Sequence, residues 1–440
     1  MRLLSGDPVP ATSPAPADAG RARSVAMAVA ARLADRDRLA DAVTSTAATT
    51  AYPESTRWRP STLALGDAGL ALCCAELHAH NPDAGWDRVG HRFLGTAVAG
   101  LTDDAPLGLF GGLSGVAAAA GQLGGAQRYR RLRAQLDDRL LPALRPAAER
   151  IDSTDGAVPA AAYDVISGLA GCAAGLLARP ADPGVRAALV EVAGVLVRLL
   201  DGDGLPRLAT PPEHVLAEQR AEAPDGWTDC GVAHGVPGLV ATLALLALDR
   251  RVGPTVTELP GLLPALRRGA AWVVGQAVTV DGRTEWPRVV LPCAGAGRPA
   301  PPGWCYGTPG VARALWLAGR ALDEPCHQRL AVDAMLAACR SDALPRSPAL
   351  CHGLAGLLTI TRLFWLDTGE PAFGRAAGRV LTELLDRYDP DLPLSYRDVE
   401  PAGSLVDNPG LLSGAAGIVL ALLAATRPDV PAWARLFLLA

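Results

Sequence analysis

The fold is decided by the stretch Pro348-Ala349-Leu350-Cys351-His352-Gly353-Leu354-Ala355-Gly356, which joins two soft metal ligands to a Gly-x-x-Gly step at the start of an apolar run. The same step recurs along the chain, with first glycines at Gly66, Gly112, Gly168, Gly235, Gly307, Gly353 and Gly414. By subtraction of these numbers, successive steps lie 46 to 72 residues apart. Such spacing is typical of a repeated two-helix unit with loops of variable length. One step alone is weak evidence, but seven of them, each before an apolar segment, predict a repeat protein.

Two kinds of segment alternate along these repeats. After each step comes an apolar segment with little charge, such as 238–246, and a helix that is apolar all round is buried on all sides. The segments between the steps have a charged face, and their apolar residues recur at intervals of three and four. Examples are 24–43, 126–144, 185–200, 322–340 and 371–388. We therefore predict an all-α fold, an α/α toroid in which seven inner helices close into a ring and seven outer helices surround it.

The composition limits the function classes. Half of the 440 residues are hydrophobic, the net charge is −4 and the pI is near 6.0, so nothing indicates binding to nucleic acid or to an anionic membrane. The nine cysteines are odd in number and spread along the chain, which favours free thiols in a reducing cytosol over a disulfide framework. We find no apolar segment of signal-peptide or transmembrane length.

The domain organisation follows from the repeats. We expect residues 1–21, rich in Pro, Ala and Asp, to form a flexible arm, and residues 22–440 to form a single toroid. Loop insertions rich in Pro, Gly and charge are expected at about 201–229 and 281–303. Residues 283–291 are expected to form a short strand or hairpin over one face, and 431–438 a closing turn.

The register of the repeats brings reactive side chains together. The two positions before the first glycine hold Cys305 and Tyr306 in the fifth repeat and Cys351 and His352 in the sixth, and the second of these positions holds His234 in the fourth. Because the inner helices are equivalent, these positions lie at one end of the ring, here called the mouth. The other repeats place at the two positions Ala64-Leu65, Phe110-Gly111, Ile166-Ser167 and Leu412-Ser413.

Cys305, Cys351 and His352 form a candidate zinc site. Two thiolates and an imidazole suit Zn²⁺, and three protein ligands leave a fourth position open, as in catalytic rather than structural sites. Neighbouring residues on a regular helix point about 100° apart. Cys351 and His352 can therefore share a metal only on the irregular turn before the helix. The alternative is a pair of buried, inert cysteines with a capping histidine.

Two further residues are candidates by register. His234 suits a fourth metal ligand, a proton carrier or a core histidine, and an imidazole titrates in the physiological range. Asp164 lies four residues before its glycine, where a catalytic group and a helix N-cap are both consistent with the pattern. Cys230 and Cys293 lie in loops near the mouth, and their role stays open. The remaining cysteines lie within helices and are predicted to be packing residues: Cys73, Cys74, Cys172, Cys326 and Cys339.

Four motifs carry a resemblance to a known family. They are Tyr163-Asp164-Val165-Ile166-Ser167-Gly168-Leu169-Ala170-Gly171, Ala233-His234-Gly235-Val236-Pro237-Gly238, Trp304-Cys305-Tyr306-Gly307-Thr308-Pro309-Gly310 and Cys351-His352-Gly353. The sequence resembles the lanthionine synthetase C-like proteins, the cyclases of lanthipeptide biosynthesis, over residues 22–440. One departure is that some members carry an arginine four residues before the first zinc cysteine, where this chain has Pro301. Arg298 is nearby but out of register, so its role stays open.

The resemblance implies a fold, a metal and a reaction. It implies an α/α toroid with one zinc ion on Cys305, Cys351 and His352. The implied reaction is addition of a cysteine thiol of a precursor peptide to dehydroalanine or dehydrobutyrine, which gives a thioether ring. His234 and Asp164 would be acid/base residues, and Tyr306 an active-site contact. The implied partners are a dehydrated precursor peptide, a separate dehydratase and an export or modification complex, in the cytosol or peripheral to the membrane through that complex.

Two other functions remain open at this point. In one, the same zinc–thiol chemistry adds glutathione to dehydrated side chains, as some relatives do. In the other, the ring is a non-catalytic peptide-binding scaffold whose zinc is structural or absent. The precursor peptide, the number, order and stereochemistry of its rings, and the oligomeric state have no signature in the sequence.

Overall fold

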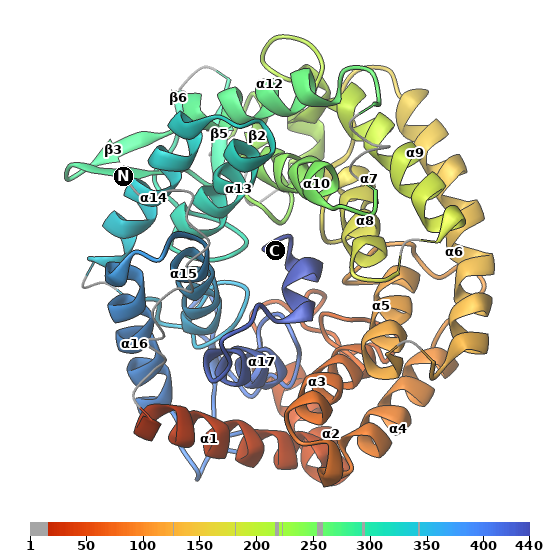
Figure 1. Ribbon diagram of the computed structural model, residues 1–440, viewed down its shortest axis with the longest axis vertical. Coiled ribbons are helices and arrows are strands. Elements are labelled where there is room, and N and C mark those ends of the chain that lie inside the picture. The colour runs from red at the N-terminus through yellow and green to blue at the C-terminus, as the bar shows by residue number, and fades with distance from the viewer. Residues whose placement is uncertain are drawn as a thin grey trace.

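The computed structural model shows a ring of helices in two layers (Figure 1) and describes residues 16–440 except 126, 181, 216–219, 222, 253–257, 293–294 and 342–343. The inner layer consists of α3 (Asp67–His80), α5 (Leu113–Gly124), α8 (Leu169–Leu177), α10 (Val236–Leu248), α13 (Thr308–Ala321), α15 (Leu354–Thr368) and α17 (Ala415–Ala425). Each inner helix contacts the next, and α17 contacts α3, so the inner ring is closed. The α/α toroid predicted from the repeats is confirmed.

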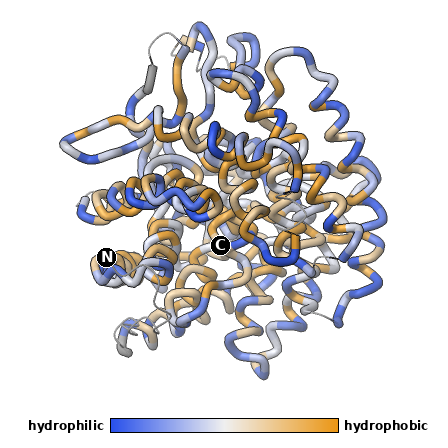
Figure 2. The backbone as a smooth tube through the Cα atoms, turned by 45° about the horizontal axis from the view of Figure 1, so that its top comes forward, coloured by the Kyte–Doolittle hydropathy of each residue, from blue (hydrophilic) through white to orange (hydrophobic). Residues whose placement is uncertain are grey.

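Each inner helix has one outer helix as its main packing partner in the outer layer. The outer layer consists of α4 (Trp86–Ala99), α6 (Arg130–Asp152), α9 (Pro183–Leu199), α12 (Leu262–Gly275), α14 (Pro325–Cys339), α16 (Pro371–Asp386) and α1 (Pro16–Ala34). The last of these comes from the start of the described chain and packs on α17, the last inner helix. The first and last parts of the described chain therefore supply the outer and the inner helix of the same pair. Figure 2 shows orange, apolar residues gathered along the inner helices and blue, polar residues toward the outside.

The Gly-x-x-Gly steps have a common structural reason. The first glycine of every step is the N-cap residue of an inner helix. A Cβ atom on the second glycine of any step would lie 2.1 to 2.3 Å from the carbonyl oxygen of the residue three places before the first glycine. No side chain tolerates that approach, so the turn can fold back on its own helix only with glycine there.

These turns are joined by a closed girdle of backbone hydrogen bonds. In every repeat, the carbonyl oxygen two places before the first glycine accepts a bond of 2.8–3.1 Å from the turn of a neighbouring repeat. The seven N–H to O=C pairs are Ala64 to Phe110, Phe110 to Ile166, Val165 to Ala233, Val232 to Cys305, Trp304 to Cys351, Cys351 to Leu412 and Leu411 to Ala64. The last bond returns to the first repeat. The prediction that these positions share one end of the ring is confirmed.

The N-terminal region differs from its predicted form. Residues 1–15 of the predicted arm lie outside the described residues, whereas 16–21 belong to α1 and not to an arm. The segment 24–43, predicted as one helix, contains the end of α1 and the start of α2 (Arg36–Thr49). The break is at Asp35, whose side chain accepts hydrogen bonds from the N–H groups of Asp37 and Arg38 and so caps the second helix.

The two insertions combine into one small sheet beside the mouth. Its antiparallel strands run in the order β1 (Ala209–Thr210), β2 (Trp227–Asp229), β5 (Val289–Leu291) and β6 (Gly295–Ala296). The predicted element at 283–291 is split, because β4 (Arg283–Glu285) pairs with β3 (Val278–Val280) in a separate hairpin. A third hairpin joins β7 (Asp398–Val399) to β8 (Leu405–Val406). The short helices are η1 (Pro82–Ala84), α7 (Ala160–Tyr163), η2 (Pro206–Leu208) and η3 (Pro212–His214).

The C-terminal segment lies at the centre of the ring (Figure 1). Its 3₁₀ helix η5 (Ala432–Phe437) is more deeply placed than the closing turn predicted for 431–438. The ring of Phe437 packs on Phe110 from repeat two and Trp304 from repeat five. The Trp304 indole N–H also donates to the Phe437 carbonyl at 2.8 Å. This aromatic cluster fills the axis of the toroid below the girdle. Among the described residues, no helix combines the length and apolarity needed to cross a bilayer.

Candidate metal centre

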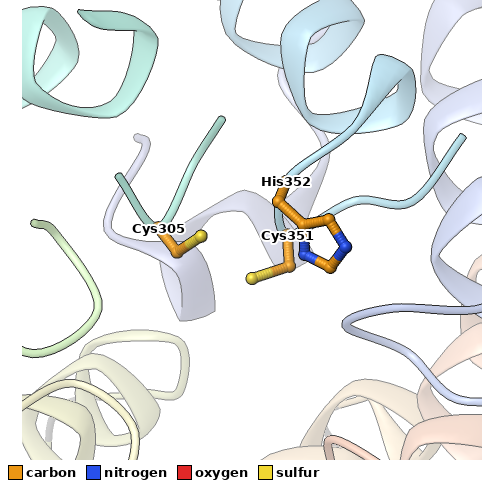
Figure 3. A group of neighbouring side chains, drawn as sticks. All are labelled: Cys305, Cys351 and His352. Carbon is orange, nitrogen blue, oxygen red and sulfur yellow. The ribbon is translucent and has the colours of Figure 1, made fainter. Parts of the chain in front are cut away.

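Cys305, Cys351 and His352 meet at the mouth. Their ligand atoms all lie within 4.8 Å of one another (Figure 3). The girdle holds the two turns side by side, since the Cys305 N–H donates to the Cys351 carbonyl at 3.2 Å. Both cysteines are free and half-buried. The predicted convergence of these three side chains is therefore present in the structure.

Cys351 and His352 lie on the turn and not on the helix. Helix α15 begins at Leu354, and its N-cap is Gly353. The two side chains escape the 100° separation of a regular helix, as a shared site requires. Close packing fixes the opposite side of the site, because a Cβ on Gly303 would lie 2.9 Å from the His352 Cα. Glycine at this position lets the two turns approach.

A carboxylate stands behind the histidine. The Nε2 atom of His352 lies 3.4 Å from Oδ1 of the buried Asp398 but lacks the alignment of a hydrogen bond. The Ser347 hydroxyl donates to the same oxygen at 2.6 Å. Burial lowers the pKa of His352, but the adjacent carboxylate of Asp398 outweighs that effect and leaves the pKa raised. A carboxylate beside one ring nitrogen is typical of metal-binding histidines, because it orients the ring.

The two thiols share their ionisation. The proximity of Cys351 and of the nearby histidines lowers the pKa of Cys305 despite its burial. The pKa of Cys351 is raised well above its ordinary value by the proximity of Cys305, by burial and by Asp398. One sulfur thus carries the negative charge more readily than the other. Two sulfurs and an imidazole whose ligand atoms lie within 4.8 Å of one another fit the donor preference of Zn²⁺, and a set of three protein ligands is typical of sites that bind a further ligand.

His234 and Asp164 form a second pair at the mouth. The His234 Nδ1 atom lies 2.6 Å from Oδ2 of Asp164, which is 3% exposed at its side chain. The other oxygen of Asp164 accepts from the N–H groups of Ser167 at 2.6 Å and Gly168 at 2.9 Å. Asp164 can therefore cap the turn and contact His234 at the same time. One oxygen holds the turn before α8 and the other orients the imidazole.

The environment of His234 favours its charged form. Burial lowers its pKa, but the hydrogen bond and charge of Asp164, with the charges of Asp229 and Cys305, leave the pKa raised. The side chain is nevertheless 40% exposed, so a molecule at the mouth can reach it. Of the roles left open for this residue, the geometry does not support a fourth metal ligand, because the described donor atoms that lie within 4.8 Å of one another do not include those of His234.

Tyr306 faces His234 and is held by a carboxylate that the sequence analysis missed. The two ring centroids are 6.5 Å apart, and the Tyr306 hydroxyl donates to Oδ2 of Asp229 at 2.9 Å. Burial raises the pKa of Asp229, while His234, Gly231 and the Tyr306 hydroxyl oppose the shift. The pKa of Tyr306 is raised strongly by burial and by Asp229. Tyr306 therefore stays protonated in the physiological range.

Asp229 and Asp398 were missed because they lie outside the two positions compared. Asp229 ends β2, six residues before Gly235, and Asp398 starts β7, far before the seventh step. Reading the repeats at the sixth position before the first glycine would have given a signal. That position holds Asp229, Ser347 and Asn408 in repeats four, six and seven, where the other repeats have Pro60, Pro106, Ala162 and Pro301.

Among the described residues, none of the other candidates belongs to the donor cluster. Cys230 is fully buried, and burial raises the pKa of its thiol, as expected of a packing residue. Cys293 lies outside the described residues, and Arg298 is exposed on the insertion. Four cysteines predicted to pack are buried: Cys73, Cys74, Cys172 and Cys339. Cys326 is exposed, and the packing prediction is wrong for it, because it begins an outer helix.

Comparisons with known proteins agree with this architecture. Residues 57–438 match the family model described as lanthionine synthetase C-like protein. A solved structure named nisin cyclase superimposes with a TM-score of 0.72 at 21% sequence identity, over 88% of this chain and 95% of that chain. At that identity, the likeness shows a shared fold. No curated protein sequence gives a significant match.

Proposed function

This chain belongs to the lanthionine synthetase C-like family, and from that premise we propose that it is a zinc-dependent lanthipeptide cyclase. The proposed substrate is a dehydrated precursor peptide. A cysteine thiol of that peptide adds to dehydroalanine or dehydrobutyrine and gives a lanthionine or methyllanthionine ring. The observation that carries the proposal is the donor cluster of Cys305, Cys351 and His352 beside the Asp164–His234 pair.

The donor set supports a resident zinc ion. Cys305, Cys351 and His352 would hold it, with Asp398 orienting the imidazole. A free thiol has a pKa of about 8.5, so only a few per cent is thiolate at neutral pH. Zinc, when bound, would supply deprotonation of a substrate thiol that occupies its open position.

The protein's own side chains would manage the proton. The addition forms an S–C bond at the β-carbon and opens the C=C double bond, so the α-carbon must gain a proton. We assign this transfer to His234, whose pKa is raised by Asp164. The proton lost by the substrate thiol balances the proton gained by carbon, so the reaction is a net isomerisation. Tyr306, held by Asp229, faces the same space.

The surroundings of the site suit a peptide. The aromatic cluster around Phe437 closes the axis below the girdle, so the substrate enters from the mouth. The sheet formed by the two insertions adjoins the mouth through Asp229 and offers a wall for an extended chain. Dehydrated residues must first be made from serine or threonine, so we propose a separate dehydratase as a partner. Reduced thiols on the substrate place the reaction in the cytosol, free or in a complex at the membrane.

A model peptide with one cysteine and one dehydroalanine tests the proposal. Ring formation leaves the mass unchanged but removes the thiol, so maleimide labelling followed by mass spectrometry counts the product. The zinc-loaded protein is expected to consume the thiol, and Cys351→Ala to lose zinc and ring formation together. Cys326→Ala, which alters an exposed cysteine of an outer helix, is the matched control.

The other outcomes separate the alternatives. Ring formation by metal-free Cys351→Ala would refute the zinc-dependent reaction. A mass increase of one glutathione on the peptide, without ring formation, would indicate a glutathione transferase. Peptide binding without thiol consumption, and unfolding on chelation, would indicate a scaffold with a structural metal.

A further inference from the structure

The Asp229–Tyr306 pair differs from the Asp164–His234 pair because the only hydroxyl proton of Tyr306 is used within the pair. Tyr306 donates its only hydroxyl proton to Asp229 at 2.9 Å. A tyrosine hydroxyl has one proton to donate and lone pairs to accept with. With its proton committed, the oxygen can offer only lone pairs to a molecule at the mouth. Tyr306 is partly exposed at the mouth, where its ring faces that of His234.

The equivalent residue of repeat seven shows what the local turn requires. Asn408 is 2% exposed, and its Oδ1 accepts from the Gly410 N–H at 2.8 Å. Oδ1 of Asp229 accepts from the Gly231 N–H at the same distance. The Asn408 amide nitrogen finds no partner among the described residues. One side-chain oxygen therefore suffices for the turn, and the second oxygen of Asp229 is an addition that serves Tyr306.

Close packing keeps the tyrosine in place. A Cβ on Gly231 would lie 2.5 Å from the Tyr306 ring and 2.5 Å from the Cys305 carbonyl oxygen. The ring thus lies directly against the backbone of the turn that Asp229 holds. Since Cys230 N–H donates to the Arg288 carbonyl at 2.9 Å, the same turn is fastened to the insertion sheet. The Tyr306 ring is therefore held by the turn that contains Gly231, and that turn is held by the insertion sheet.

From these contacts, and resting on the function proposed above, we infer that Tyr306 is a hydrogen-bond acceptor for the amide N–H of the substrate's dehydroamino acid, with Asp229 as the residue that fixes this polarity. His234, the side chain that faces Tyr306, does not suit this role. His234 uses Nδ1 on Asp164, and its remaining ring nitrogen is a donor when the ring is charged. The peptide N–H needs an acceptor, and Tyr306 provides a neutral one.

The substitution Asp229→Asn tests the polarity without changing the shape. The Gly231 N–H requires an acceptor, so the asparagine places its oxygen there, as Asn408 does on Gly410. Its amide nitrogen then faces Tyr306 and donates to the hydroxyl oxygen. That oxygen loses its accepting role, and the hydroxyl proton turns toward the mouth. Asp229→Asn should fold, because the fold already uses asparagine at the equivalent position.

Raman spectroscopy reports the polarity without any substrate. The tyrosine doublet distinguishes a hydroxyl that donates from one that accepts, and subtraction of the Tyr306→Phe spectrum isolates Tyr306. We expect a strong donor in the parent protein and an acceptor signature in Asp229→Asn. Tyr396→Phe is the control for the subtraction, because its buried hydroxyl donates to the Leu384 carbonyl. An unchanged Tyr306 signature in Asp229→Asn would overturn the assigned polarity.

A double-mutant cycle tests the contact with substrate, read as kcat/KM for ring formation and as affinity for a labelled dehydroalanine peptide. Tyr306→Phe and Asp229→Asn should each lower kcat/KM and the peptide affinity by about 3- to 10-fold, as expected for the loss of one hydrogen bond. The loss of kcat/KM should come mainly from a higher KM. In the Phe background, Asp229→Asn should cost less than about twofold. Replacing the dehydroalanine N–H of the peptide by an ester oxygen should weaken binding to the parent protein but not binding to Tyr306→Phe.

The outcomes keep this inference separate from the cyclase proposal. Additive effects of the two substitutions, or equal weakening of all variants by the ester, would overturn the assigned contact while ring formation still stands. Absence of ring formation in every variant would overturn the proposed function, and the Raman and affinity measurements would still decide the role of Tyr306.

Discussion

The mouth has two arcs that share a backbone but differ in chemistry. Every repeat contributes a bond to the girdle. At the last position before the first glycine, repeats four to six carry His234, Tyr306 and His352, whereas repeats one, two and seven carry Leu65, Gly111 and Ser413. We call repeats four to six the reactive arc and repeats one, two and seven the silent arc. The repeat fixes the position of each side chain, and the reactive arc differs from the silent arc in which residues occupy that position.

The reactive arc also differs in how its side chains are supported. Each of its three side chains has a buried aspartate as neighbour: Asp164 for His234, Asp229 for Tyr306 and Asp398 for His352. Burying a carboxylate is costly unless it is hydrogen-bonded. Each of these carboxylates accepts a further hydrogen bond from a backbone N–H or a hydroxyl. These three repeats therefore place three separate aspartate-supported polar pairs within an apolar ring.

The largest expected difference between the arcs concerns the metal. Cys305→Ala removes one of three donors, and zinc affinity should fall by at least about a hundredfold, with loss of activity. The measurement is metal content after dialysis against a weak chelator, together with thiol consumption. Leu412→Ala, at the equivalent position of repeat seven, should keep its zinc. Full zinc content in Cys305→Ala would remove this residue from the site.

The second test concerns proton transfer at His234. His234→Asn should keep zinc but lower kcat by about 10²- to 10⁴-fold, because an amide cannot deliver a proton. Ser413→Asn places the same amide at the equivalent position of the silent arc and should change kcat by less than about twofold. A kcat for His234→Asn within tenfold of the parent protein would show that the proton comes from elsewhere.

The third test uses glycines that precede the helices in the two arcs. Gly231→Ala forces a methyl group 2.5 Å from the Cys305 carbonyl oxygen and the Tyr306 ring, so the free energy of unfolding should fall by about 1–3 kcal/mol. A Cβ on Gly111 meets nothing within 4 Å, so Gly111→Ala should change it by less than about 0.5 kcal/mol. Urea denaturation measures both. An equal loss of unfolding free energy in Gly231→Ala and Gly111→Ala would show that the two turns are packed equally closely.

The same comparison explains what the sequence predicts. The turns and the inner helices follow from a local pattern, because each Gly-x-x-Gly step requires its own tight turn. The convergence of Cys305, Cys351 and His352 follows from register within that pattern. The physical cause is local, so it is visible in a short stretch of sequence.

Contacts between distant segments had no such local signal. Asp229 ends a strand whose pairing partner β5 lies in the other insertion, whereas Asp398 lies on a local hairpin but contacts His352 and Ser347 of the preceding repeat. Phe437 fills the axis because two turns on opposite sides of the ring leave room for it. These features depend on which residues meet after folding, which a pattern of spacings does not contain.

The smallest expected effect concerns the pH dependence of the reactive arc. The pKa of His234 is raised, so its acid form persists to higher pH than in a free histidine, and activity should fall as the pH rises through that value. In Asp164→Asn, the amide oxygen can still accept from Ser167 and Gly168, while its nitrogen donates to His234 Nδ1 and disfavours the charged ring. The alkaline fall of kcat should therefore move to lower pH by about one unit. An unchanged pH profile in Asp164→Asn, with zinc retained, would assign the titration to another group and leave Asp164 with the turn alone.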